Sequence, residues 1–132
     1  MSGPRLIAAL TLPGVERSVP HARRFVRDIL APVHAELLDD MALVVDELAG
    51  NAVRHTASGR GGKFTVALFH APGVLRAEVT DEGAGGGRPV PRADPAGESG
   101  RGLHIVAALA VRWGHRPDGP RTTVWAEFVT PG

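Results

Sequence analysis

A carboxylate and a carboxamide lie one helical turn apart in the middle of the chain. Glu47 and Asn51 are four residues apart, and His55 follows at the same spacing. On a helix this spacing places the three side chains in one row. The carboxamide oxygen of Asn51 is a hard ligand suited to magnesium, and Glu47 could act as general base on a hydroxyl or a water molecule. The alternative is an amphipathic helix edge, with Glu47 paired to Arg54 or His55.

A second carboxylate is followed closely by glycines. Asp81 comes directly after a predicted strand, and Gly83 and Gly85 follow it. A carboxylate at a strand end can accept a hydrogen bond from an exocyclic amine, such as the amino group of adenine. Glycines let the backbone approach a flat ring closely because they have no Cβ. The alternative is an ordinary Asp-Gly turn at the start of a loop.

The third group of candidate residues is a pair of glycines that precedes a run of residues with helical spacing. Gly100 and Gly102 flank Arg101 immediately before that run. The first N–H groups of a helix have no partner within the helix, so a helix start that glycines leave open can bind phosphate. The alternative is a plain helix start capped by Ser99.

Hydrophobic periodicity and turn residues predict the elements that hold these residues in place. Strands paired as hairpins alternate with helices, and no linker separates two cores. We therefore expect one α+β domain over residues 1–132, a two-layer sandwich with a mixed, mostly antiparallel sheet and about three helices on one face. The predicted strands are 6–12, 63–70, 74–80, 111–116 and 122–129, the helices are 15–30, about 35–55 and 102–113, and 81–99 is a long loop.

The second predicted helix has a well-defined apolar face. At 100° per residue, its apolar side chains fall within an arc of roughly 120°. Asn51 lies nearest to this arc in the polar row, and Asp46 points away from it, so we expect Asp46 in solvent. The residues of the apolar arc are Leu37, Leu38, Met41, Val44, Val45, Leu48 and Ala52.

Composition excludes several classes of function. The chain has 132 residues, is 43% apolar and carries a formal net charge of +1, whereas nucleic-acid binders usually have a strong basic excess. No run of about 20 apolar residues is present, so we expect no membrane span. The chain has no cysteine, which suits a reducing compartment such as the cytoplasm. The sequence contains no HExxH pattern, and this argues against a zinc hydrolase.

The three clusters together resemble the motifs of the Bergerat-fold (GHKL) ATPases, the superfamily of gyrase, histidine kinases and heat-shock chaperones. Residues 46–55 resemble its N box, 81–85 its first glycine box and 100–103 its second. Thr122-Thr123 resembles the threonine site on the last strand of the family. The likeness runs from about residue 6 to residue 129. Within the superfamily, the chain is similar in its short length to the small anti-sigma-factor serine kinases of the RsbW and SpoIIAB type, in particular to actinobacterial members.

The resemblance implies a role for each polar residue. Glu47 would be the catalytic base, and Asn51 would coordinate the magnesium ion that bridges the phosphates. Asp81 would bind the adenine amino group, and Thr123 or Thr122 would help through water.

The resemblance also implies roles for the glycine boxes. Gly83 and Gly85 would make room for the nucleotide, and residues 86–99 would form a lid over ATP. Backbone amides at Gly100 and Gly102 would hold phosphate, with Arg101 beside it.

Two functions remain open from the sequence. In the first, the protein uses ATP and Mg²⁺ to phosphorylate a serine of a STAS-type anti-sigma-factor antagonist and also sequesters a sigma factor. In the second, it is an ATP-dependent protein-binding module without useful kinase activity. The resemblance further suggests a homodimer, and nothing indicates direct contact with nucleic acid or membrane.

Overall fold

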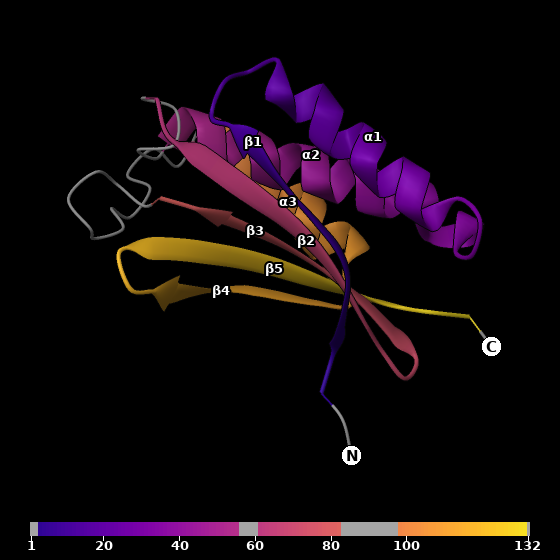
Figure 1. Ribbon diagram of the computed structural model, residues 1–132. Coiled ribbons are helices and arrows are strands. Elements are labelled where there is room, and N and C mark those ends of the chain that lie inside the picture. The colour runs from indigo at the N-terminus through magenta and orange to yellow at the C-terminus, as the bar shows by residue number, and fades with distance from the viewer. Residues whose placement is uncertain (1–2, 56–60, 83–97, 132) are drawn as a thin grey trace.

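Five strands form one sheet, with the strand order β1-β2-β3-β5-β4. The computed structural model describes residues 3–55, 61–82 and 98–131 (Figure 1). In chain order the elements are β1 (Arg5–Pro13), α1 (Ser18–Leu30), the 3-10 turn Ala35–Leu37, α2 (Leu38–His55), β2 (Lys63–Ala71), β3 (Val74–Asp81), α3 (Glu98–Leu109), β4 (Arg112–Asp118) and β5 (Arg121–Val129).

Every pairing between these strands is antiparallel. Two tight turns connect the hairpins β2–β3 and β4–β5, and each turn contains a glycine with positive φ, Gly73 at 76° and Gly119 at 64°. Such angles strain any residue with a Cβ, so glycine sets both hairpins. The predicted α+β sandwich is thereby confirmed.

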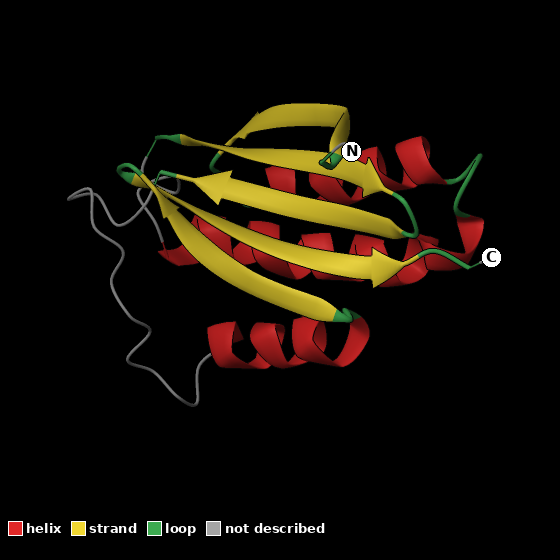
Figure 2. Ribbon diagram, turned by 90° about the horizontal axis from the view of Figure 1, so that it is seen from below, coloured by secondary structure: helices red, strands yellow, loops and turns green. Residues whose placement is uncertain are grey.

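The helices form a single layer on one face of the sheet (Figures 1 and 2). α2 packs against β2 and β3, with α1 and α3 on either side of it. Every second residue of β3 is buried against this layer, and most of the predicted apolar arc of α2 is buried with it. The fully buried members of the arc are Met41, Val44, Val45, Leu48 and Ala52.

The bounds of two helices, α1 and α3, differ from the sequence prediction. α1 begins at Ser18 rather than residue 15, because a tight turn, with Ser18 N–H donating to the Val15 carbonyl, precedes it. α3 begins at Glu98 and ends at Leu109, about one turn earlier than predicted at each end. Its predicted end extended too far because Trp113 belongs to β4, where it pairs with Ala126.

The sequence predicts that Asp46 lies in solvent, and this prediction is wrong. Its carboxylate forms an ion pair with Arg23 of α1, and its side chain is 27% exposed. The ion pair therefore joins the two neighbouring helices. No helix in the described parts of the chain is long and apolar enough to cross a membrane.

Candidate functional site

Asp81 lies at the end of β3 on the helix-covered face of the sheet. It continues the alternation of buried residues that includes Val79 and Ala77, and it is only 6% exposed. Thr122 of β5 is its register partner. Because paired residues of antiparallel strands point to the same face, the carboxylate of Asp81 and the hydroxyl of Thr122 lie on the same side of the sheet.

The hydroxyl of Thr122 lacks a partner within the described chain. Its Oγ1 atom is buried and forms no hydrogen bond to a described residue. Buried polar atoms in proteins are nearly always satisfied by protein, water or ligand. A buried hydroxyl beside a buried carboxylate therefore points to an occupant such as a bound water or a ligand.

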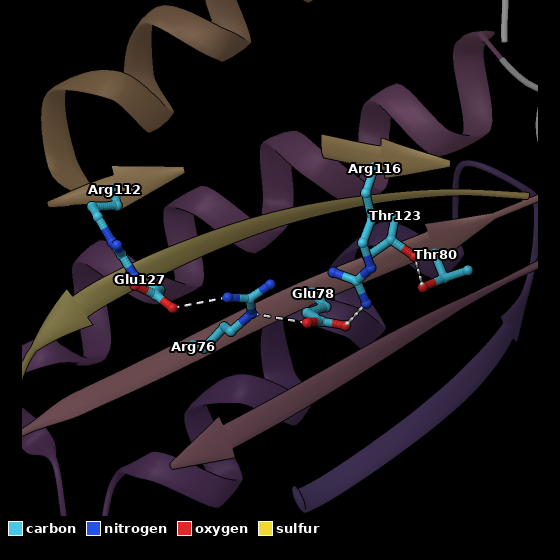
Figure 3. A network of polar contacts seen from close by, with 7 residues as sticks. All are labelled: Arg76, Glu78, Thr80, Arg112, Arg116, Thr123 and Glu127. Atoms are coloured by element: carbon cyan, nitrogen blue, oxygen red, sulfur yellow. Dashed lines mark hydrogen bonds and ion pairs between the residues drawn. The ribbon is translucent and has the colours of Figure 1, made fainter. Parts of the chain in front are cut away.

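Thr123 lies on the opposite face of the sheet from Asp81. Its Oγ1 atom is 2.8 Å from Oγ1 of Thr80, the two hydroxyls sharing one hydrogen bond (Figure 3). Of the two threonines that the sequence left open as partners of Asp81, only Thr122 is on the correct side. The expectation for Thr123 is therefore corrected: its hydroxyl joins β3 to β5 on the face without helices.

Glu47 and Asn51 are half-buried on α2, the helix that packs on β3. Oδ1 of Asn51 accepts a hydrogen bond from Nη2 of Arg54 at 3.1 Å. Gly50 makes room for this arrangement, because a Cβ there would lie 2.9 Å from Nη1 of Arg54. The spacing of three residues between Asn51 and Arg54 is the sequence signal for this contact. On the sequence alone, Arg54 is named as a partner of Glu47, and its contact with Asn51 is missed. No ion pair joins Glu47 to a described side chain.

The backbone of Gly100, Arg101 and Gly102 lies in the first turns of α3, which begins at Glu98. Ser99 is thus inside the helix and is not its cap. The side chains of Arg101 and His55 lie outside the described parts of the structure, and so do all atoms of Gly83 and Gly85 and residues 86–97 of the predicted lid.

The described site elements meet at one end of the molecule. The end of α2 leads toward the start of β2, and the backbone N–H of Lys63 there donates to Oε1 of Glu82, just beyond β3, at 3.2 Å. α3 starts at the same end and runs toward the start of β4 (Figure 2). The carboxamide of Asn51, the carboxylate of Asp81 and the start of α3 therefore lie on the same face of the sheet, as a single nucleotide site requires.

Of the candidate site residues on α2, Asn51 offers its carboxamide oxygen Oδ1 as a ligand for a cation, and Glu47 carries carboxylate oxygens one turn earlier. The described residues contain no cluster of three or more histidine or acidic side chains that could hold a metal ion. Magnesium usually keeps several waters and takes few protein oxygens when substrate phosphates complete its shell. The carboxamide oxygen of Asn51 therefore fits an ion that arrives with a nucleotide and keeps part of its water shell.

A family model for the histidine kinase-like ATPase domain matches residues 12–128. The chain belongs to this family. Membership in the histidine kinase-like ATPase family implies that the protein binds ATP, in agreement with the carboxylate and hydroxyl found on adjacent strands. No curated protein sequence matches the chain.

A solved structure shows that the fold of this ATPase domain recurs elsewhere. The crystal structure of the RsbU and RsbW domains of Rv1364c from Mycobacterium tuberculosis superposes with a TM-score of 0.71 at 22% identity. The match covers 98% of this chain and 32% of the other, so the chain corresponds to about a third of that protein. At this identity the likeness establishes the fold.

Proposed function

We propose that this ATPase domain is a regulatory serine kinase, which transfers phosphate from ATP to an anti-sigma-factor antagonist and sequesters a sigma factor. The likeness of its motifs to the RsbW type, and of its fold to a structure that includes an RsbW domain, supports the choice of partners. The proposal treats ATP as phosphoryl donor, Mg²⁺ as its counter-ion and the antagonist's serine as acceptor.

The observation that carries the proposal is the pair formed by Asp81 and Thr122. They are opposite each other in the β3–β5 register, and the hydroxyl of Thr122 has no hydrogen-bond partner among the described residues. An adenine amino group would donate to the Asp81 carboxylate. A water bound between the ring and Thr122 would satisfy the hydroxyl.

The half-buried polar residues of α2 would act on the phosphate end of the nucleotide. When bound, Mg²⁺ would neutralise the charge that develops on the phosphates. Before Oδ1 of Asn51 could bind the magnesium ion, its hydrogen bond from the guanidinium of Arg54 would have to break. Glu47, one turn earlier, would accept the proton of the attacking serine hydroxyl.

A labelled-phosphate assay tests the kinase function. The protein is incubated with γ-labelled ATP, Mg²⁺ and a STAS-type antagonist encoded in the same genome, and transfer to the antagonist is measured. We expect Glu47→Ala to reduce transfer by at least about 100-fold, the usual contribution of a general base, while ATP affinity stays within about threefold. Transfer that persists at the wild-type rate in Glu47→Ala would show that this carboxylate is not the base.

The second function is an ATP-dependent binding module without useful kinase activity. The same assay separates it from the kinase: this function predicts nucleotide binding and nucleotide-dependent capture of the antagonist, with no labelled product. Because Glu47 is half-buried and forms no ion pair with a described side chain, its carboxylate is available as a base, and this favours the kinase.

A further inference from the structure

A groove runs between the edge strand β1 and helix α1, and none of the candidate nucleotide-site residues lines it. Its volume is about 590 Å³, within the range of clefts that hold ligands. The floor includes Leu10 and Leu12 of β1 and Phe25 of α1, all half-buried. These apolar side chains would lose more water-exposed surface if a further chain covered them.

The outer wall of the groove is a basic stripe along α1 and the residue that precedes it, Arg17. Arg17, His21 and Arg24 recur at intervals of three or four residues, so they follow one side of the helix, and all three line the groove. Asp28 continues the stripe as its one acidic member.

The two arginines of the stripe have no acidic partner within the described chain. The nearby Arg23 and Arg27 form ion pairs with Asp46 and Asp39 of α2. Arg17 and Arg24 form no ion pair with any described side chain. The groove is therefore apolar at its floor and positively charged along its wall.

β1 is an edge strand that is open to pairing within the described structure. It pairs with β2 alone, and the register is continuous from Ala8 to Pro13, beyond an irregularity at Ile7. Natural edge strands usually carry charged residues that prevent further pairing, but the only charged residue of β1 is Arg5. The half of β1 that borders the groove can thus accept another strand.

We propose that this groove binds an extended acidic segment of a partner protein, which adds to the sheet as a strand beside β1. Main-chain hydrogen bonds to β1 would provide part of the affinity. Alternate side chains of the added strand would enter the groove, with aliphatic groups on Leu10 and Leu12 and carboxylates near Arg17 and Arg24.

A second copy of the same chain fits this edge less well. Pairing β1 with β1 of another copy about a two-fold axis would place the same surface on both sides. The stripe of Arg17 and Arg24 would then face its own copy, and like charges across an interface are unfavourable. Charge complementarity therefore favours an acidic partner.

A peptide titration tests the charge requirement. The probe is a short fluorescent peptide of the repeat Val-Thr-Glu-Thr, and the matched peptide carries Lys in place of Glu. We expect the Glu peptide to bind at least about tenfold more tightly, with an affinity that falls as salt increases. Equal affinity of the two peptides would overturn the proposal.

Protein variants locate the peptide on α1. The double variant Arg17→Glu/Arg24→Glu changes only exposed side chains and should reduce affinity at least about tenfold. Arg121→Glu, an equally exposed substitution on β5, should leave affinity unchanged, and so should Asp81→Asn in the nucleotide site. An undiminished affinity in the double variant would place the peptide elsewhere.

N-methylated peptides test the strand geometry. In a strand, alternate N–H groups point to opposite edges, so methylation of the Val and Glu positions blocks one edge and methylation of the Thr positions blocks the other. We expect one methylated peptide to lose binding and the other to keep it. Retained binding by both would exclude strand addition, and a homodimer in sedimentation that the peptide dissociates would identify a second copy as the occupant.

Discussion

At the scale of single residues, the buried carboxylate of Asp81 is the group whose role is easiest to measure. We predict that Asp81→Asn weakens ATP binding by at least about tenfold, because a hydrogen bond to a charged group contributes about 1.5–3 kcal/mol. Isothermal titration with ATP and with GTP measures the effect. GTP carries a carbonyl where adenine carries the amine, so the variant should also lose preference for ATP. Unchanged ATP affinity would remove Asp81 from the site.

The two adjacent threonines of β5 should behave in opposite ways. Thr122→Val removes an unpartnered buried hydroxyl, so it should leave the free energy of unfolding unchanged or higher and weaken ATP binding several-fold. Thr123→Val removes the hydrogen bond to Thr80. It should lower stability by about 1 kcal/mol and leave ATP affinity intact.

Urea unfolding and ATP titration of both variants provide the comparison. Each variant serves as the control for the other, since both lose one hydroxyl from the same strand. A loss of ATP affinity in Thr123→Val alone would mean that the face without helices holds the nucleotide.

At the scale of elements, a network of arginine and glutamate side chains ties three strands together on the face without helices (Figure 3). Glu127 of β5 accepts hydrogen bonds from Arg112 of β4 at 2.6 and 2.9 Å and from Arg76 of β3 at 2.8 Å. The guanidinium of Arg76 also lies 4.3 Å from the ring centre of Trp125. The network fixes the order β3-β5-β4 from outside the core.

This network predicts a pH-dependent contribution to stability. Burial acts to raise the pKa of Glu127, but the hydrogen bonds from Arg112 and Arg76 outweigh it, so the pKa lies below its ordinary value. A carboxyl group whose pKa is lower in the folded state than in the unfolded state stabilises the fold at pH values above the unfolded pKa. This stabilisation is lost as the pH falls through the folded pKa.

Glu127→Gln should therefore destabilise the protein by about 2 kcal/mol at neutral pH, and the difference from wild type should shrink in acid. Urea unfolding at pH 7 and near pH 3 measures it, with Glu16→Gln at an exposed position as control. A difference that stays constant across this range would show that the charge of Glu127 contributes nothing.

Element types and hairpins were predictable from local patterns, but some boundaries were not. Alternation along β2 and β3 and the glycines of their turn are local signals, and the structure agrees with them within one residue. The end of α3 was extended too far because Trp113 continues the helical spacing. Its pairing with Ala126 of β5, which is remote in sequence, decides its conformation.

At the scale of the whole molecule, the proposed site can form only in the folded chain. Its described residues come from α2, β3 and β5, so the unfolded chain cannot bind the nucleotide through them together. Saturating Mg-ATP should therefore stabilise the fold by about 2.7 kcal/mol at 100 times Kd, a rise in Tm on the order of 10 °C. Thermal unfolding with ATP and EDTA should show a smaller rise, and Asp81→Asn, at a tenfold weaker affinity, should show about half of the wild-type rise. An equal rise with and without Mg²⁺ would argue against a metal-dependent site.

Sequence patterns were enough to predict the type of fold, the apolar face of α2 and the positions of the polar motifs, because these follow from periodicity, glycine placement and residue chemistry. It could not choose between Thr122 and Thr123, since they are adjacent and chemically identical. The tertiary structure decided between them, because the register of β3 and β5 places one beside Asp81 and the other on the opposite face. Packing between side chains and elements likewise decides three further features, which local sequence patterns do not specify. These are the hydrogen bond from Arg54 to Asn51, the Arg23–Asp46 ion pair and the basic groove beside β1.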